Sequence, residues 1–400
     1  MLKSKLFLTF LVLCLLTLFL GSCSNRQTLL LLNWGEYINE DLITKFEEEY
    51  GVEVKMSLAD SNELFYSKVM GGTTVYDLVI PSDYMIEKMA KKDLIQEIDY
   101  TKLDNWNSNN PLTPGVADIL NSLTSFEFQG TTKEAKDYCV PYFWGTFGIM
   151  YRKTPALIAS GIEDPSKALD VYFNEASRPA GTRIGMYDSP RFSYAAALQY
   201  LGLNFNDYSK ELLAQAKTVL ANSRIHEWGF DTLKKNILSN NLDLAYTWTG
   251  DMLDMLYMRL DEGQSIQDID FDIVIPDNSI AFMDAFVIPK KSRNSELAYK
   301  FIDFFLDPLN AYENASTVGY CTPVVKAYNW IVDPQLALND GVIDAQYYLE
   351  EESWLNSWSY ANNRYYPLTS PGSFNGISLS DFDTKIIDLI NQMINQIKTS

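Results

Sequence analysis

Histidine is almost absent from this chain of 400 residues, which contains only His226. A single histidine argues against metal sites built from several histidines. It also argues against a Ser-His-Asp triad, unless His226 is its base. His226 stands in the segment Ile225-His226-Glu227-Trp228, which we expect at the surface. We therefore predict no metal site, no catalytic residue and no cofactor.

Positive charge is also scarce, because 32 lysines and arginines face 52 aspartates and glutamates, for a formal net charge of −20. Such a surface repels nucleic acid phosphates and attracts cations, so we expect no nucleic acid partner. The same charge is compatible with solubility alone. Of the four cysteines, Cys139 and Cys321 lie in the body of the chain, and they either pair or remain two buried thiols.

Aromatic residues, by contrast, are abundant, with 8 tryptophans and 25 tyrosines. These are many for an ordinary core, so we expect some of them to line a ligand site. The length is sufficient for two domains with substantial cores.

The first 22 residues have the pattern of a secretion signal. A basic start containing Lys3 and Lys5 precedes an apolar run over residues 6–20, which is short for a membrane span. Leu20-Gly21-Ser22-Cys23 resembles the bacterial lipobox, in which the cysteine is lipidated and becomes the new N-terminus. We predict a lipid anchor on Cys23 that holds the protein in the periplasm or on the outer face of the cytoplasmic membrane. An ordinary signal peptide is the alternative.

The region after the leader alternates between strand and helix patterns. Residues 28–33, 52–56 and 76–80 predict strands, and helical patterns over residues 40–50, 61–70 and 85–92 follow them. This order predicts an α/β domain with a mainly parallel sheet, whose ligands bind beyond the carboxyl ends of the strands. Four side chains follow strand ends and should share one rim: Trp34, Tyr37, Ser82 and Tyr84.

The stretch 244–251, Leu-Ala-Tyr-Thr-Trp-Thr-Gly-Asp, predicts a buried strand that ends beside an indole and a carboxylate. Trp248 and Asp251 could hold a cation, or Asp251 could cap the helix that follows. Residues 138–151 and 281–289 read as further strands, which could cross between two domains.

Six motifs in order resemble the polyamine-binding proteins of bacterial ABC transporters, the spermidine/putrescine-binding type. The resemblance covers about residues 29–323 and is carried by Asn33-Trp34-Gly35-Glu36-Tyr37, Pro81-Ser82-Asp83-Tyr84, Val140-Pro141-Tyr142-Phe143-Trp144-Gly145, Trp248-Thr249-Gly250-Asp251, Phe282-Met283-Asp284 and Gly319-Tyr320-Cys321-Thr322-Pro323. It implies a type II periplasmic-binding-protein fold of two α/β lobes joined by crossing strands. It places lobe 1 at residues 28–141 plus 283–328, and lobe 2 at residues 142–282 plus 329–400.

The resemblance also implies a site in which aromatic rings cover the methylenes of a polyamine and carboxylates bind its ammonium groups. Carried over by motif, the ligand-binding residues are Trp34, Tyr37, Ser82, Tyr84, Asp188, Trp248, Phe282, Asp284 and Tyr320. Asp251 has no acidic counterpart in the pattern, and we interpret it as a helix cap. Ser189 and Phe192 stand where the family often has acids, and Leu355 stands near a position where it can use a glutamine. The choice of polyamine therefore stays open.

These patterns predict a monomeric receptor that captures a polyamine and hands it to the permease of an ABC transporter. One alternative is a receptor for another solute, such as a quaternary amine, a sugar or ferric iron, for which Tyr365 and Tyr366 are a weak indication. Another is an extracellular hydrolase in which Asp188 and Asp284 act as paired carboxylates. A polyamine sensor that only signals to a partner is the third.

Overall fold

The computed structural model describes residues 26–107, 112–366 and 376–399. The predicted signal segment and the predicted lipidation of Cys23 lie outside the described residues. Within the described ranges, no helix combines the length and the apolar character that a membrane crossing needs.

The first lobe is built on a parallel sheet with the strand order β2-β1-β3, formed by β1 (Thr28–Asn33), β2 (Glu53–Leu58) and β3 (Leu78–Val79). α2 (Glu40–Tyr50) joins the first two strands. It begins where the Asn39 side chain accepts a hydrogen bond from the Asp41 backbone, and it ends at Gly51, whose φ of 66° suits glycine. The sequence predicts both ends of this helix correctly.

The second lobe is built on a mixed sheet in which β12, β11, β6, β9, β7 and β8 lie side by side, with β10 paired to β6. Its strands are β6 (Val140–Arg152), β7 (Ile184–Tyr187), β8 (Glu227–Gly229), β9 (Leu244–Trp248), β10 (Phe271–Val274), β11 (Ile280–Phe286) and β12 (Ile377–Ser378). β7, β8 and β9 are parallel to one another. β6 runs antiparallel to its neighbours β9 and β11. This sheet is therefore mixed, whereas that of the first lobe is parallel.

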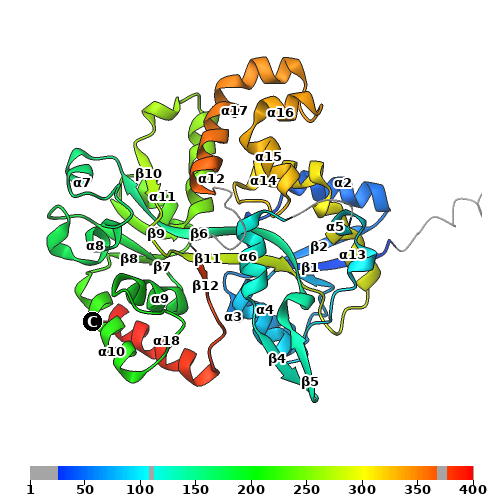
Figure 1. The fold of residues 1–400 in the computed structure, drawn as a ribbon, viewed down its shortest axis with the longest axis horizontal. Helices are drawn as coiled ribbons and strands as arrows, with labels where there is room; N and C mark the ends of the chain where they lie inside the picture. Colours follow the sequence, from blue (N-terminus) through cyan, green and yellow to red (C-terminus); the bar gives the residue numbers. More distant parts are fainter. Residues whose placement is uncertain (1–25, 108–111, 367–375, 400) are drawn as a thin grey trace, which may run out of the picture.

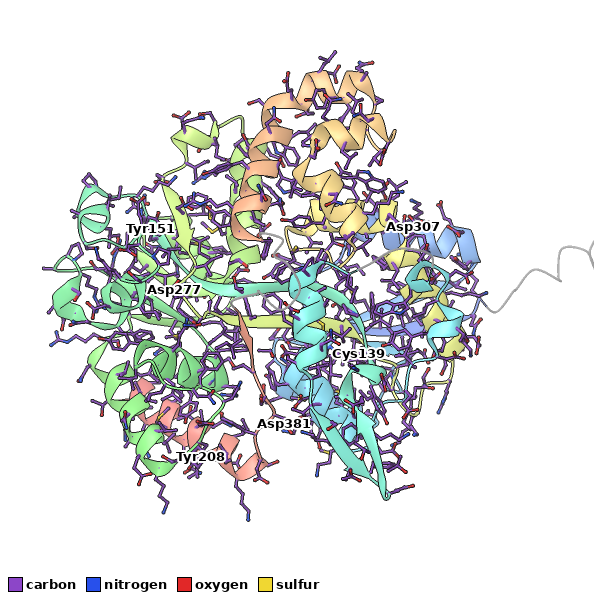
Figure 2. The ribbon with its side chains drawn as sticks, in the orientation of Figure 1. Cys139, Tyr151, Tyr208, Asp277, Asp307 and Asp381 are labelled. Atoms are coloured by element: carbon purple, nitrogen blue, oxygen red, sulfur yellow. The ribbon has the colours of Figure 1, made fainter. Side chains whose placement is uncertain are left out.

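β6 and β11 cross from one lobe to the other (Figure 1). Figure 2 labels Cys139, directly before β6, and Tyr151 near its end, and the two lie on opposite sides of the molecule. β11 and the residue that follows it also contact the first lobe, because Asp284 forms an isolated bridge with Ser82 and Val287 forms one with Val79. The register of the β6–β11 pair shifts between Asp284 and Ala285, as at a β-bulge.

Helices cover both sheets and the junction. Those along the first 140 residues are α3 (Asn62–Gly71), α4 (Asp83–Lys91), α5 (Asp104–Asn107) and α6 (Pro114–Ser122), with the hairpin β4 (Ser125–Phe128) and β5 (Thr131–Glu134). Those of the second lobe are α7 (Pro155–Ala159), α8 (Ala168–Phe173), α9 (Pro190–Tyr200), α10 (Lys210–Asn222), α11 (Thr232–Leu238) and α12 (Thr249–Asp261). Those after β11 are α13 (Ser295–Leu306), α14 (Pro308–Val318), α15 (Val325–Val332), α16 (Pro334–Asn339), α17 (Ala345–Tyr365) and α18 (Thr384–Lys398).

Two of these later helices return to different lobes. α13 lies on the first lobe, and α18 packs on α9 and α10 of the second (Figure 1). Cys139 and Cys321 are both buried and free, so of the two states that the sequence leaves open, the structure shows two separate thiols.

Candidate functional site

A cleft lies between the lobes, at the carboxyl ends of three parallel strands from each sheet. β1, β2 and β3 end on one side, and β7, β8 and β9 on the other. The cleft encloses about 870 Å³ of empty volume, including its opening. We call it the ligand cleft, and its lining is Trp34, Gly35, Tyr37, Ala59, Asp60, Ser61, Asn62, Glu63, Ser82, Tyr84, Tyr187, Ser189, Phe192, Phe230, Asp231, Trp248, Asp251, Phe282, Asp284 and Tyr320. This is the position where α/β sheets bind ligands.

Asp284, on the crossing strand β11, is buried and 5% exposed. Its carboxylate accepts hydrogen bonds from the Tyr37 hydroxyl at 2.8 Å and the Ser82 hydroxyl at 2.6 Å. Asn62 donates to the Ser82 hydroxyl at 2.9 Å and so fixes its orientation. Burial raises the pKa of Asp284 to about 6, although both hydroxyls act in the opposite direction. Among the described residues, no lysine or arginine forms an ion pair with this carboxylate, which would gain from a cationic partner.

Aromatic rings form both walls of the ligand cleft. Trp34 packs against Phe65, with ring centroids 4.6 Å apart, and its indole donates to the Ile80 carbonyl at 2.8 Å. On the other wall, Trp248 packs against Phe282 with centroids 4.4 Å apart. Rings held in this way offer rigid apolar surface to methylene groups and π faces to ammonium groups.

Asp251 is a second buried carboxylate in the ligand cleft, and our interpretation of it as a helix cap is wrong. Trp248 occupies the cap position of α12, and Asp251 lies in the first turn with 7% exposure. Its oxygens accept hydrogen bonds from the Tyr320 hydroxyl at 3.1 Å and the Thr247 hydroxyl at 2.5 Å. Burial raises its pKa, although Lys234 and Thr247 counteract this effect. The sequence does not reveal this role, because aspartate is also one of the residues that most often cap the start of a helix.

The two carboxylates are linked through aromatic hydroxyls. Tyr37 donates to Asp284 and Tyr320 to Asp251, and the two tyrosine rings meet edge to face with centroids 4.8 Å apart. Phe282, two residues before Asp284 on β11, lies between the Trp248 and Tyr320 rings. An extended cation with charge at both ends would therefore find an acid, a hydroxyl and aromatic surface along its path.

The charge of the ligand cleft has one sign. Among the residues that the structure describes, its lining contains five carboxylates and no lysine or arginine: Asp60, Glu63, Asp231, Asp251 and Asp284. The Lys234 ammonium acts electrostatically on Asp251 but lies outside the lining. It bonds to Asp254 at 2.6 Å and lies 3.5 Å from Glu36 of the first lobe. The lining thus favours a cation and disfavours an anion.

Eight of the nine residues predicted from the sequence line the ligand cleft, and Asp188 does not. The Asp188 carboxylate forms an ion pair with Lys398 of α18, in a neighbouring pocket. Asp188 and Asp284 therefore do not face each other as the paired acids of a hydrolase would. Tyr365 and Tyr366, the indication of an iron site, are buried away from the lining, bonded to Asp272 and Thr249.

Several lining residues are absent from the sequence prediction. Asn62 and Glu63 follow the end of β2, and Phe230 and Asp231 follow the end of β8. The sequence predicts a strand at 52–56, so the rule that ligands bind beyond strand ends could have indicated Asn62 and Glu63. It predicts no strand at β8, because residues 225–228 are expected at the surface, and so it carries no comparable signal for Phe230 and Asp231. No group of three or more histidine, cysteine, aspartate or glutamate side chains suited to a metal ion occurs in the described ranges.

Gly250→Ala should disturb this site by overpacking. A Cβ at Gly250 would lie 2.4–2.5 Å from atoms of the Tyr320 ring, so that ring would have to move. Overpacking of this kind costs about 1–3 kcal/mol, and we expect the midpoint of thermal unfolding to fall by roughly 1–4 °C, measured by circular dichroism. Gly35→Ala is the matched control in the same cleft, because nothing lies within 4 Å of its added Cβ. Equal midpoints for the two variants would contradict the prediction.

Comparison with known proteins agrees with this architecture. A family described as bacterial extracellular solute-binding proteins matches residues 41–337. The putrescine-binding periplasmic protein SpuD of Pseudomonas aeruginosa is 28% identical over 293 residues, 72% of this chain and 76% of that protein. The spermidine/putrescine-binding periplasmic protein of Escherichia coli is 28% identical over 347 residues, 85% of this chain and 90% of that protein.

A solved structure shows the same fold. It is the spermidine/putrescine ABC transporter substrate-binding protein PotD of Streptococcus pneumoniae, with a TM-score of 0.61, 26% identity, and coverage of 94% of this chain and 99% of that chain. The structural likeness confirms the predicted two-lobed periplasmic-binding-protein fold. The family match covers more than half of the sequence. The chain belongs to the bacterial extracellular solute-binding proteins, a family whose members bind solutes and are not enzymes.

Proposed function

We propose that this protein is an extracytoplasmic, lipid-anchored receptor that captures a polyamine between its lobes and delivers it to an ABC permease. One observation carries the proposal: an aromatic cleft lined by five carboxylates, with no lysine or arginine among the lining residues that the structure describes. A polyamine is a linear chain of methylenes with ammonium groups at its ends. It therefore matches both components of this lining.

The names of the relatives support the same class of ligand. Those from Pseudomonas aeruginosa are named for putrescine, for putrescine and cadaverine, or for putrescine and agmatine. That from Escherichia coli is named for spermidine and putrescine. All of these ligands carry positive charge at both ends of an aliphatic chain, which is the feature that the lining favours.

In the proposed complex, Asp284 and Asp251 each receive one ammonium group of the ligand. Trp34 and Tyr37 of lobe 1 cover the methylenes from one side, and Trp248 with Phe282 covers them from the other. Ser82, Tyr84 and Tyr320 contribute hydroxyl groups. The proposed lobes keep the boundaries 28–141 plus 283–328 and 142–282 plus 329–400. Closure of these lobes would remove water from both ion pairs and strengthen them.

Isothermal titration calorimetry with putrescine and spermidine tests the proposal. We expect at least one of them to bind with micromolar or tighter affinity. The absence of heat with either amine at high protein concentration would overturn the proposal. A neutral alcohol of the same length, butane-1,4-diol, is the matched control and should not bind, because it offers no charge to the buried carboxylates.

Anchoring and delivery need separate tests. Cys23→Ala should abolish incorporation of labelled fatty acid and release the protein from the membrane fraction. If the protein without its signal segment is a monomer, light scattering should give the mass of a single chain. Loss of polyamine uptake on deletion of the protein would distinguish transport from sensing, since a sensor would leave uptake by the permease intact.

Putrescine affinity should fall as the pH falls through about 6. Burial raises the pKa of Asp284 to about 6, so the empty cleft increasingly holds the protonated acid below that pH, while an aliphatic ammonium stays charged. Protonation must be reversed before an ammonium can bind, so affinity should be constant above about pH 7 and about tenfold lower at pH 5. Calorimetry across this range measures the slope, and an affinity unchanged down to pH 5 would contradict the prediction.

A further inference from the structure

A second pocket adjoins the ligand cleft at its edge in lobe 2. The two share Ser61, Glu63, Ser189 and Phe230 in their linings. We call this second pocket the side chamber. Its far wall is formed by Ile387, Ile390 and Asn391 of α18, and Asp188 also lines it. A polyamine too long for the ligand cleft would extend past Ser189 and Phe230 into this chamber.

The charge pattern changes at that boundary. The ligand cleft contains five carboxylates and no cation in its described lining, whereas the side chamber contains Glu63 and Asp188 together with Arg191. The Lys398 ammonium adds a second positive charge, because it is paired with the Asp188 carboxylate. A further ammonium group of a ligand that reached the side chamber would therefore gain less than in the ligand cleft. In the chamber two carboxylates already face two positive charges, those of Arg191 and Lys398.

Lys398 is held in place by more than its ion pair. Its ammonium lies over the Trp228 ring, 5.0 Å from the centroid, and its side chain is 25% exposed. α18 itself is fixed by Ile390, Met393 and Ile394, which are buried against the second lobe. Arg191, by contrast, is engaged elsewhere, with hydrogen bonds to the Phe205 carbonyl and the Asn206 side chain at 3.0 and 2.9 Å. Lys398 is thus the cation that occupies Asp188, the carboxylate that the side chamber does not share with the ligand cleft.

We propose that Lys398 is a specificity-determining residue: its ammonium occupies Asp188 as an internal substitute for a ligand amine, and restricts the cleft to short diamines. The proposal rests on the polyamine-binding function proposed above. It explains how Asp188 can lie beside the cleft without being available to a ligand. A diamine such as putrescine uses the ligand cleft alone. Beyond Glu63, which both linings share, the third ammonium of spermidine would meet only Asp188, from which it would have to displace Lys398.

The test compares putrescine and spermidine by calorimetry in the wild-type protein and in Lys398→Met, which keeps the apolar stem and removes the charge. We expect the wild type to prefer putrescine. The variant should bind spermidine at least about fivefold more tightly than the wild type does, with putrescine affinity unchanged, because Asp188 becomes free for the third ammonium. Lys385→Met, at the exposed start of the same helix, is the matched control and should change neither affinity.

Two further variants separate this effect from a general change of charge. Lys398→Arg keeps a cation on Asp188 and should show no gain for spermidine. In the double variant Asp188→Asn/Lys398→Met, the gain should disappear, because the carboxylate that receives the third ammonium is gone. Unchanged thermal midpoints would show that all variants are folded.

The outcomes distinguish this inference from the proposed function. If the wild type binds putrescine but Lys398→Met gains nothing for spermidine, or gains equally for both amines, the role of Lys398 is overturned and polyamine binding stands. If spermidine already binds the wild type as tightly as putrescine, the role of Lys398 is also overturned. If neither amine binds the wild type, both proposals fail together.

Discussion

Asp284→Asn is expected to weaken putrescine binding by about 30-fold or more. In the proposed complex this carboxylate receives one ammonium group in a buried position, and truncating one partner of a buried, hydrogen-bonded charge pair costs about 2–5 kcal/mol. The asparagine keeps the size of the side chain. The hydroxyls of Tyr37 and Ser82 bond to different oxygens of Asp284, at 2.8 and 2.6 Å, so the single amide oxygen can accept from one of them while the amide NH2 donates to the other. Calorimetry measures the loss of affinity.

The same variant should be at least as stable as the wild type when no ligand is present. The folded-state pKa of Asp284 is raised to about 6 by burial, above the ordinary value of 3.8. An acid with a raised folded pKa destabilises the fold progressively as the pH rises from its unfolded pKa through its folded pKa, that is from about 4 to about 6. At pH 7 the charged group therefore opposes folding, by at most about 3 kcal/mol, and asparagine removes this opposition.

Together these effects give a signature that simple misfolding cannot imitate: affinity falls while the midpoint of thermal unfolding holds or rises. Asp388→Asn, which removes an exposed carboxylate on α18, is the matched control and should change neither quantity. Retention of wild-type affinity in Asp284→Asn would remove this carboxylate from the proposed site.

Asp251→Asn is expected to weaken putrescine binding by about 30-fold as well, and it decides between two interpretations of one residue. If Asp251 receives the second ammonium, the variant loses affinity at little cost in stability. Tyr320 and Thr247 bond to different oxygens of Asp251, and the asparagine can accept from one of these hydroxyls and donate its NH2 to the other. If its role were to stabilise the start of α12 through its negative charge, the variant would instead lose about 0.3–1 kcal/mol of stability and keep its affinity.

Calorimetry and thermal unfolding, measured on the same samples, separate these outcomes. Asp261→Asn, an exposed acid at the other end of α12, is the control for a general change in the charge of the helix. A monoamine such as butylamine adds a second comparison. It can satisfy one carboxylate only, so Asp251→Asn and Asp284→Asn should not both reduce its affinity as strongly as they reduce that of putrescine.

Much of the fold was accessible from the sequence because its local signals are strong. The apolar run that forms β1, the cap Asn39 with Gly51 around α2, and the strand β9 all coincide with the predicted ranges. The rule that ligands gather beyond parallel strand ends also predicts Trp34 on the lining that the structure shows, and the family resemblance predicts Trp248 there. Each of these strands, helix ends and lining residues is determined by amino acids that stand within a few positions of it in the sequence.

Features that depend on distant partners could not be predicted in this way. The partner of Asp188 is Lys398, 210 residues later in the chain, and no local pattern links them. The hairpin of β4 and β5 and the helices α14 to α17 are not predicted either. For α14 the local signals were present and not used, because Asp307 caps it, Pro308 begins it and Gly319 ends it. Asp251 shows the opposite difficulty: its local pattern was clear, but the fold gives that position a different environment.

Asp284 lies on β11, at the irregular step of the strand that joins the two lobes, and this position has a thermodynamic consequence. Without ligand, an unneutralised charge is buried within the connection between the lobes. An arriving ammonium would act as the counterion of that connection, so occupancy and rigidity of the junction become one linked equilibrium. A partner protein that tests the stiffness of the junction could then distinguish a loaded receptor from an empty one without contacting the ligand.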